Sequence, residues 1–350
     1  MTRETRKKGL EALAQKILSK RQQDEFILVY PHVRADGDAY GSSFALVKVF
    51  AKLGIEAAVL AEENLSANME FMRAGSKFIN WNELSEYDQA ELKRRVTLSI
   101  QVDSSEEDRL ASRLRIFQES PEFGIIDHHI SSKVNGGLIF IDPEAGANVE
   151  LVYTLILRLE ELTGKKLLDK EVALTIYAGL LTDTGSFSYD NTKPETLRIA
   201  AELLEYDINV AELNNHLFKE KPWNKLLAET KLIQKANLSA NKKIAYLTVP
   251  QAFMNDNNIA DDDLENMPAV LRNVKGVIVS LVLRETSEGT VRGNLRSTGP
   301  NDISVIARAH NGGGHLNAAG FTISVTELGE GNLDSIAEQI ITEINHKLEL

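Results

Sequence analysis

Residues 26–38 read FILVYPHVRADGD, an apolar run followed by a polar segment. The first five residues have the length and the β-branched and aromatic composition of a buried strand. The segment after them places His32, Asp36 and Asp38 within seven positions. We expect these residues on a glycine-containing loop at the carboxyl end of the strand, where parallel sheets bind ligands and where the three side chains can converge. The alternative is a solvated turn in which Asp36 and Gly37 only reverse the chain.

The sequence around this segment predicts an α/β domain with a mainly parallel sheet flanked by helices. Short apolar runs alternate with longer helical patterns over roughly the first two hundred residues, and Gly54 and Gly164 suit helix ends. Strands separated by helices imply βαβ units. The expected strands are 26–30, 96–102, 123–126 and 138–141, and the expected helices are 42–53, 148–162 and 171–181.

The pattern changes in the second half of the chain. Residues 194–236 are almost wholly helical, with a break at Lys221-Pro222, where proline fits the first turn of a new helix. Consecutive strand patterns and a last helix then predict a smaller α+β domain. The expected elements there are strands 244–249, 277–283, 290–296 and 320–325, and helix 333–348. The predicted divisions are a first domain at 1–205, a helical linker at 206–238 and a second domain at 239–350.

Composition narrows the class of protein. Lys and Arg total 39 against 51 Asp and Glu, a net charge of −12, which argues against a broad basic face for duplex nucleic acid. The sequence has no cysteine, so disulfides, thiolate zinc sites and cysteine nucleophiles are excluded. The first residues are charged without a following apolar core, and no run approaches ~18 apolar residues. We therefore expect a cytoplasmic protein without a membrane span.

Three more acidic or histidine-containing sites follow apolar elements. Asp103 follows the strand at 96–102, and Asp127-His128-His129 follow the strand at 123–126. Asp183 closes the helix at 171–181. Taken singly, Asp103 is more often explained as the cap of the next helix, and Asp183 is better explained as part of a helix-end turn. Two adjacent histidines directly after an apolar strand are less easily explained as structural residues.

Together these sites predict a centre for two metal ions at one rim of the sheet. Four carboxylates and two imidazoles would repel one another severely without cations, and two divalent ions supply four positive charges. Oxygen and nitrogen ligands without sulfur suit Mn²⁺, with Mg²⁺, Co²⁺ or Zn²⁺ as alternatives. The six candidate ligands are His32, Asp36, Asp38, Asp103, His128 and Asp183.

A glycine-rich segment in the second domain predicts a phosphate-binding site. Residues 311–320 read NGGGHLNAAG, and consecutive glycines let backbone N–H groups approach an anion, with His315 and Asn317 as further donors. Arg292 and Arg296 lie at even spacing on a predicted strand, so we expect both on one face. Arg296 followed by Ser297 is a candidate phosphate clamp. A flexible glycine loop with two surface arginines is the alternative.

Taken in their order along the chain, the metal-ligand motifs and the glycine-rich motif resemble those of the DHH phosphoesterase superfamily with a DHHA1 domain. Within that superfamily they are most similar to the nanoRNase/pAp-phosphatase branch. The resemblance covers nearly the whole chain and implies a DHH domain followed by a DHHA1 domain. It implies one Mn²⁺ on His32, Asp36 and Asp103, and a second on Asp38, Asp103, His128 and Asp183. It also implies that Asp103 and His129 are catalytic, with His129 at the scissile phosphate, and that Asp127 orients a histidine.

The resemblance also implies a substrate and a reaction. Very short RNA would be hydrolysed to mononucleotides, and pAp to AMP and phosphate, by two-metal activation of a bridging water. Hydrolysis of pGpG or pApA and exopolyphosphatase activity are the alternatives, and a non-catalytic nucleotide sensor is the alternative outside enzymes. A homodimer is compatible with the family. The residues implied to bind the substrate are Arg296, Ser297, Gly313, Gly314, His315 and Asn317.

Overall fold

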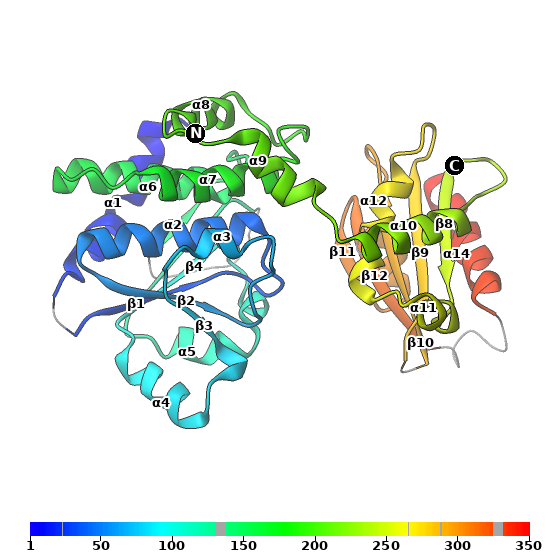
Figure 1. Ribbon diagram of the computed structural model, residues 1–350, viewed down its shortest axis with the longest axis horizontal. Helices are drawn as coiled ribbons and strands as arrows, with labels where there is room; N and C mark the ends of the chain where they lie inside the picture. Colours follow the sequence, from blue (N-terminus) through cyan, green and yellow to red (C-terminus); the bar gives the residue numbers. More distant parts are fainter. Residues whose placement is uncertain (23, 130–137, 265, 288, 325–331) are drawn as a thin grey trace. The chain divides into compact units, whose positions relative to one another are not determined.

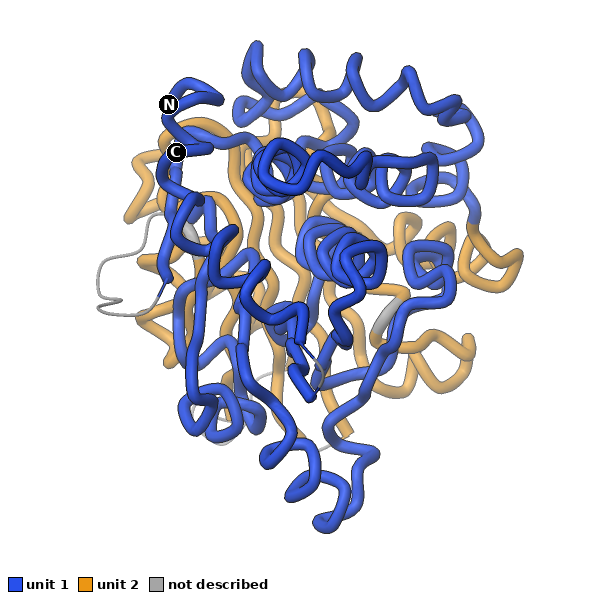
Figure 2. Tube along the Cα trace, turned by 90° about the vertical axis from the view of Figure 1, so that its left-hand side faces the viewer, with its two compact units in different colours: residues 1–220 blue, residues 221–350 orange. Residues whose placement is uncertain are grey.

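The structure, a computed structural model, describes residues 1–350 apart from 23, 130–137, 265, 288 and 325–331. The chain forms two compact units, residues 1–220 and residues 221–350 (Figure 2). The helical segment that the sequence predicts at 206–238 is divided between these units. In the part of the chain that the structure covers, no helix is long and apolar enough to cross a membrane.

The first unit is built on a six-stranded sheet in the order β3-β2-β1-β4-β5-β6. Figure 1 labels β1, β2, β3 and β4 of this sheet. Every neighbouring pair in it is parallel. This confirms the predicted α/β fold with a parallel sheet. Strands β2 and β3 were not predicted from the sequence. The strands are β1 Phe26–Tyr30, β2 Glu56–Ala61, β3 Phe78–Asn80, β4 Leu98–Val102, β5 Phe123–Asp127 and β6 Leu138–Ile141.

Helices cover both faces of this sheet. Along β1, Ile27 and Val29 join the hydrophobic core formed with α1, α2, α6 and α7, whereas Phe26 and Leu28 join the core formed with α4 and α5. A strand buried on both faces explains the uninterrupted apolar run in the sequence. The helices are α1 Arg3–Ser19, α2 Gly37–Leu53, α3 Glu70–Arg73, α4 Glu86–Arg95, α5 Leu114–Gln118, α6 Asn148–Thr163, α7 Lys170–Asp183, α8 Pro194–Leu204 and α9 Val210–Asn214.

Helix α2 begins at Gly37, five residues earlier than the predicted start at residue 42. The Asp36 side chain accepts hydrogen bonds from the backbone N–H groups of Asp38 and Ala39, at 3.0 and 3.1 Å, and so caps the helix. The segment predicted as a loop therefore ends in a helical turn. The far end is as predicted, because Gly54 ends the helix in the left-handed conformation, with φ of 77°.

The second unit is built on another six-stranded sheet, in the order β11-β12-β10-β9-β8-β7. Its β8 and β9 are parallel and the other pairs are antiparallel, as a smaller α+β domain requires. Helix α14 packs on one face, and α10 and α12 pack on the other. Residue 325 of the predicted strand 320–325 lies outside the described residues. The elements are α10 Trp223–Lys235, β7 Asn237–Leu238, β8 Ile244–Val249, α11 Gln251–Asn257, α12 Met267–Arg272, β9 Val279–Glu285, β10 Thr290–Ser297, α13 Ser304–Ala309, β11 Gly313–His315, β12 Ala318–Ser324 and α14 Leu333–Leu348.

A buried ion cluster joins four elements of the first unit. The Arg6 guanidinium on α1 donates to Asp142 after β6 at 2.7 Å and to Glu150 on α6 at 3.0 Å. Thr196 on α8 donates to the other oxygen of Glu150 at 2.5 Å. Arg6 is 2% exposed, and both carboxylates are fully buried. Since a buried charge needs a partner, each member holds the others in place.

We predict that Arg6→Met destabilises the protein by about 3–5 kcal/mol, because it leaves two buried carboxylates without their cation. Urea unfolding measures the change. The matched control is Lys8→Met, which removes a charge from an exposed position of the same helix and shifts stability by less than about 0.5 kcal/mol. Equal stabilities of the two variants would show that the cluster does not hold the helices together.

Candidate metal centre and active site

Three adjacent strands carry the predicted residues at their carboxyl ends. Strand β1 is followed by His32, β4 by Asp103, and β5 ends at Asp127, directly before His128 and His129. In the sheet, β1, β4 and β5 are neighbours. The carboxyl ends of parallel strands meet at one edge, which is where open α/β sheets bind ligands.

Asp38 lies at the same edge of the sheet, between the start of α2 and the start of α6. Asp38 lies in the first turn of α2 and is fully buried. Its carboxylate accepts from the backbone N–H groups of Asn148 at 2.5 Å and Val149 at 2.9 Å, at the start of α6. The α6 N-cap residue, Ala147, has no side-chain acceptor of its own. Asp38 therefore reaches the site from a helix, not from a loop as the sequence predicted, and it caps a second helix there.

Asp103 lies at the middle of the group. Its two carboxylate oxygens are 3.5 Å from His32 Nε2 and 3.3 Å from His128 Nε2. His128 Nε2 is also 3.8 Å from one oxygen each of Asp38 and Asp183. Asp183 enters from the last turn of α7. These contacts connect the carboxyl ends of the strands to the first turn of α2 and the last turn of α7.

All six predicted ligands come together in this arrangement. His32 Nε2 lies 4.0 Å from Asp36 Oδ1, which completes the set. Potential ligand atoms lie within 4.8 Å of one another in three groups. These groups are His32, Asp36 and Asp103; Asp38, His128 and Asp183; and Asp103, His128 and His129.

Two atoms at the centre lack hydrogen bonds. Asp103 Oδ1 and His128 Nε2 are buried without a hydrogen-bond partner among the described residues, although they lie 3.3 Å apart. A buried polar atom without a hydrogen bond costs free energy, so each of these two atoms calls for a further partner. A cation would accept the lone pairs of both. The donor set of this site therefore fits a divalent metal ion.

The backbone at Asp103 is also unusual. Asp103 has φ of 59°, in the left-handed region that residues other than glycine adopt rarely. Its backbone N–H donates to Ile126 on β5 at 2.9 Å, which holds this conformation against the neighbouring strand. Local strain of this kind concentrates at functional sites.

The charges of the group shift one another's pKa values. Burial opposes ionisation of Asp103, but its contacts with His128 and His32 outweigh burial and lower its pKa to about 2. Burial also opposes protonation of His128, but Asp103 and Asp38 outweigh burial and raise its pKa to about 10. Burial first, and neighbouring carboxylates second, raise the pKa of Asp38 well above its usual range. Burial raises the pKa of Asp183 to about 6. Without cations, the site therefore retains protons.

Backbone carbonyls fix two of the imidazoles. His32 Nδ1 lies 2.8 Å from the Val33 carbonyl oxygen, and His128 Nδ1 lies 3.3 Å from the Ala145 carbonyl oxygen. A proton on each Nδ1 then donates to the carbonyl and leaves Nε2 free as a ligand atom.

A carboxylate holds the third imidazole. His129 Nδ1 lies 2.8 Å from Asp127 Oδ1, and the Ser105 hydroxyl donates to the other oxygen of Asp127 at 2.7 Å. This hydrogen bond raises the pKa of His129. His129 is far more exposed than the other two imidazoles, His32 and His128, with 53% of its side chain accessible. Asp127 thus lies where the sequence resemblance expected it, against a histidine.

Three polar residues at the site were not among the site residues predicted from the sequence. Asn191 donates to the Asp183 carboxylate at 3.1 Å, and Arg109 Nη2 lies 3.2 Å from His32 Nδ1. In the amide orientation that satisfies both of its ends, Asn148 accepts from the backbone N–H of Asp103 at 3.2 Å. None of the three follows a predicted strand, so no local pattern marks them.

The predicted substrate residues of the second unit gather at the end of β10 and the hairpin of β11 and β12. The Ser297 hydroxyl donates to the Asn301 carbonyl at 2.6 Å and accepts from Asn317 Nδ2 at 2.8 Å. Arg296 is opposite Ala318 in the register of β10 and β12. Gly313 and Gly314 are paired with Gly320 and Ala319 of β12. The His315 side chain lies outside the described residues.

The glycine cluster forms a strand, and two of its glycines are explained by packing. A Cβ at Gly312 would lie 2.2 Å from the Gly320 carbonyl oxygen, and one at Gly314 would lie 2.4 Å from the Ala318 carbonyl oxygen. Gly314 also has φ of 143°, which disfavours other residues. A Cβ at Gly313 would meet nothing within 4 Å. Gly313 and Gly314 lie in the edge strand β11, so this part of the segment is not the flexible glycine loop that the sequence left as the alternative, and phosphate binding there stays a prediction.

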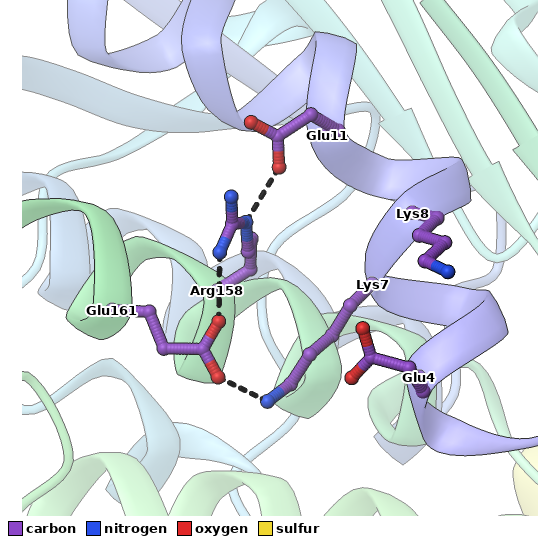
Figure 3. Close-up of a pocket in the computed structure, with 6 residues that line it drawn as sticks. All are labelled: Glu4, Lys7, Lys8, Glu11, Arg158 and Glu161. Atoms are coloured by element: carbon purple, nitrogen blue, oxygen red, sulfur yellow. Dashed lines mark hydrogen bonds and ion pairs between the residues drawn. The ribbon is translucent and has the colours of Figure 1, made fainter.

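Two surface pockets of the first unit lie apart from this site. One of about 310 Å³ lies between α1 and α6, and Arg158 there is bonded to Glu11 and Glu161 while Lys7 pairs with Glu161 (Figure 3). Its lining is Glu4, Lys7, Lys8, Glu11, Arg158 and Glu161. The other, of about 450 Å³, is lined in part by the first residues of β2, at the opposite end of the strands. Neither is lined by any of the six predicted ligands.

Comparison with known proteins agrees with this organisation. Residues 26–180 match the DHH family N-terminal domain, and residues 241–346 match the DHHA1 domain. The first match contains the strands and loops that carry His32, Asp103 and His128.

Similar proteins extend over nearly the whole chain. The bifunctional oligoribonuclease and PAP phosphatase NrnA of Thermus thermophilus is 31% identical over 326 residues, or 92% of this chain and 90% of that protein. The protein of the same name from Bacillus subtilis is 28% identical over 85% of this chain and 89% of its own length. A solved exopolyphosphatase-related protein from Bacteroides fragilis shares the fold, with a TM-score of 0.85 at 23% identity over 97% of this chain and 96% of that one. The chain therefore belongs to the DHH family and carries a DHH domain followed by a DHHA1 domain, as the sequence resemblance predicted.

Proposed function

We propose that the protein is a metal-dependent phosphoesterase that hydrolyses short oligoribonucleotides to mononucleotides, and pAp to AMP and phosphate. The observation that carries this proposal is the convergence of four carboxylates and two imidazoles around the buried, unpaired Asp103 Oδ1 and His128 Nε2. Family membership and the NrnA relatives support hydrolysis of phosphate esters of nucleotides.

The proposed cofactor is a pair of divalent cations, with Mn²⁺ preferred because the donors are oxygen and nitrogen without sulfur. His32, Asp36 and Asp103 would hold one, and Asp38, Asp103, His128 and Asp183 would hold the other. When bound, two such ions neutralise a phosphoryl group, lower the pKa of the attacking water and stabilise the leaving oxygen.

The chain's own residues prepare this chemistry. Asp103 lies between the two imidazole ligands and stays ionised down to low pH, so its charge is available to both cation positions. His129 is fixed through Nδ1 by Asp127, which leaves Nε2 for the substrate. Its raised pKa favours a protonated ring, which donates from Nε2 to a phosphate oxygen or to the leaving group.

In the second unit, Arg296, Ser297, Gly313, Gly314, His315 and Asn317 form the proposed binding site for the nucleotide. Arg296 supplies the guanidinium that pairs with a phosphate. The hydrogen bond from Asn317 Nδ2 to the Ser297 hydroxyl, at 2.8 Å, keeps these two residues together.

The substrate assignment predicts release of mononucleotides from 5′-phosphorylated RNA dimers and trimers with Mn²⁺, and release of phosphate from pAp. Chromatography of the products measures both, and excess EDTA serves as the control that abolishes turnover. Hydrolysis of only pGpG, pApA or polyphosphate in the same panel would reject this substrate assignment in favour of the corresponding alternative.

We predict that Asp103→Asn lowers kcat about a thousandfold or more, because the loss of several kcal/mol of charge stabilisation is worth that factor. The control is Asp108→Asn, an exposed carboxylate nearby in the sequence, which leaves kcat unchanged. Thermal unfolding of both variants verifies that they fold. A wild-type protein that binds nucleotides without turning them over would instead identify a sensor.

We also predict that cation binding releases protons. The pKa of His128 is about 10, so its ring is protonated at neutral pH in the absence of a cation, and its proton must leave before Nε2 can act as a ligand. The affinity for Mn²⁺ therefore rises with pH, and it falls further below pH 6 as Asp183 is protonated. Calorimetric titration in two buffers with different ionisation enthalpies measures the protons released. Identical heats in the two buffers would contradict the prediction.

A further inference from the structure

Strand β10 carries two polar side chains, those of Arg292 and Asn294, for which the proposed reaction has no function. Exposure alternates along the strand, and Val291 and Leu295 are buried in the core that includes α14. Arg292, Asn294 and Arg296 alternate with them and are half-buried. They therefore occupy the opposite face of the sheet, as their spacing in the sequence predicts.

Arg292 lies in a setting where an arginine is costly unless an anion is present. The register places it opposite Arg284 of β9 and Thr322 of β12. Like charges on directly opposed residues of neighbouring strands destabilise a sheet. Arg284 is compensated by Asp261 at 2.7 Å. By contrast, Arg292 makes no hydrogen bond or ion pair with any residue that the structure describes.

The side of Arg292 that faces β12 carries small side chains and no carboxylate on the described residues. Asn294 is opposite Gly320, and Gly320 is opposite Gly313, so two neighbouring strands have no side chains at this level. Along the described parts of β10 and β12, this face carries no carboxylate. Its residues are Thr290, Arg292, Asn294 and Arg296 on β10, and Ala318, Gly320, Thr322 and Ser324 on β12.

We infer that this face of β10 binds the backbone of a single-stranded oligonucleotide, with Arg292 and Arg296 on different phosphates. The inference rests on the proposed function and deepens it. Arg292 and Arg296 are four positions apart, or about 13 Å along the strand, which gives each guanidinium its own phosphate. Asn294 between them is placed to meet a sugar hydroxyl or a base edge, and the glycine surface leaves room for the ribose and base.

This arrangement makes Arg292 a determinant of substrate length. Substrates with only the scissile phosphate and one further phosphate reach Arg296 but not Arg292. A trinucleotide or tetranucleotide adds a phosphate that Arg292 binds. Arg292 thus raises kcat/KM for trinucleotides and tetranucleotides relative to that for dinucleotides and pAp.

The test compares Arg292→Met with the wild type on 5′-phosphorylated RNA dimers, trimers and tetramers. The ratio of kcat/KM for the trimer to that for the dimer is expected to fall about tenfold, through KM, because a charge-assisted hydrogen bond is lost. Arg292→Lys, which keeps the charge, is expected to restore most of the ratio. Lys275→Met removes an exposed cation elsewhere in the second unit and is expected to leave the ratio unchanged.

A binding measurement separates this inference from the proposed function. Fluorescence anisotropy with a labelled tetramer in EDTA reports binding without hydrolysis. The logarithm of the binding constant falls linearly with the logarithm of the salt concentration. In Arg292→Met the slope of this dependence is expected to become shallower by about 0.7, the value for one phosphate contact on a single strand. An unchanged trimer-to-dimer ratio, or an unchanged slope, would overturn the inference even if the wild type hydrolyses every RNA in the panel. If the wild type hydrolyses none of them, the proposed function fails, and the salt slope still decides whether Arg292 binds a phosphate.

Discussion

Mutual repulsion among four carboxylates is the constraint on which the first unit depends. Asp36, Asp38, Asp103 and Asp183 lie around two imidazoles, and His32, Asp38 and Asp103 in this group are buried. The raised pKa values of Asp38 and Asp183 and the pKa of about 10 at His128 describe one condition, a site with more negative charge than the chain can neutralise. Helix starts and backbone N–H groups offset part of that negative charge. Asp103 Oδ1 and His128 Nε2 lack hydrogen bonds, and the charge around these two atoms is the part that needs cations.

The surrounding structure is built to hold these residues close together. The Arg6 cluster ties α1, the segment after β6, α6 and α8 into one body with its own buried ion pairs. Helices α2 and α7 approach closely at glycines, since a Cβ at Gly41 would lie 3.0 Å from the Thr175 carbonyl oxygen. This close contact brings Asp38 at the start of one helix and Asp183 at the end of the other to the same rim.

Local sequence signals predicted the elements that carry the site better than the elements that support it. The β1 run, the final helix and Gly54 behave as predicted because each depends on its own residues. Strands β2 and β3 were missed, since their identity as strands comes from pairing with β1 and with each other. The six ligand positions could be proposed because each directly follows an apolar element or lies near its end. Asn148, Asn191 and Arg109 could not be proposed as site residues, because only the tertiary fold brings them to the ligands. The pairing of β11 with β12 could not be predicted, because a run of glycines suggests a loop. Two of these glycines are instead needed because a side chain there would clash with the neighbouring strand.

Asp38 serves two structures at once, and this limits how the site can change. Its two oxygens receive the first N–H groups of α6, and the same carboxylate faces His128 and the proposed cation. Any replacement that weakens the ligand also uncaps a helix that carries Glu150, one of the partners of Arg6. Metal loading and the integrity of the helical layer are therefore linked through a single side chain. Loss of activity in an Asp38 variant would consequently not distinguish a chemical defect from a mechanical one.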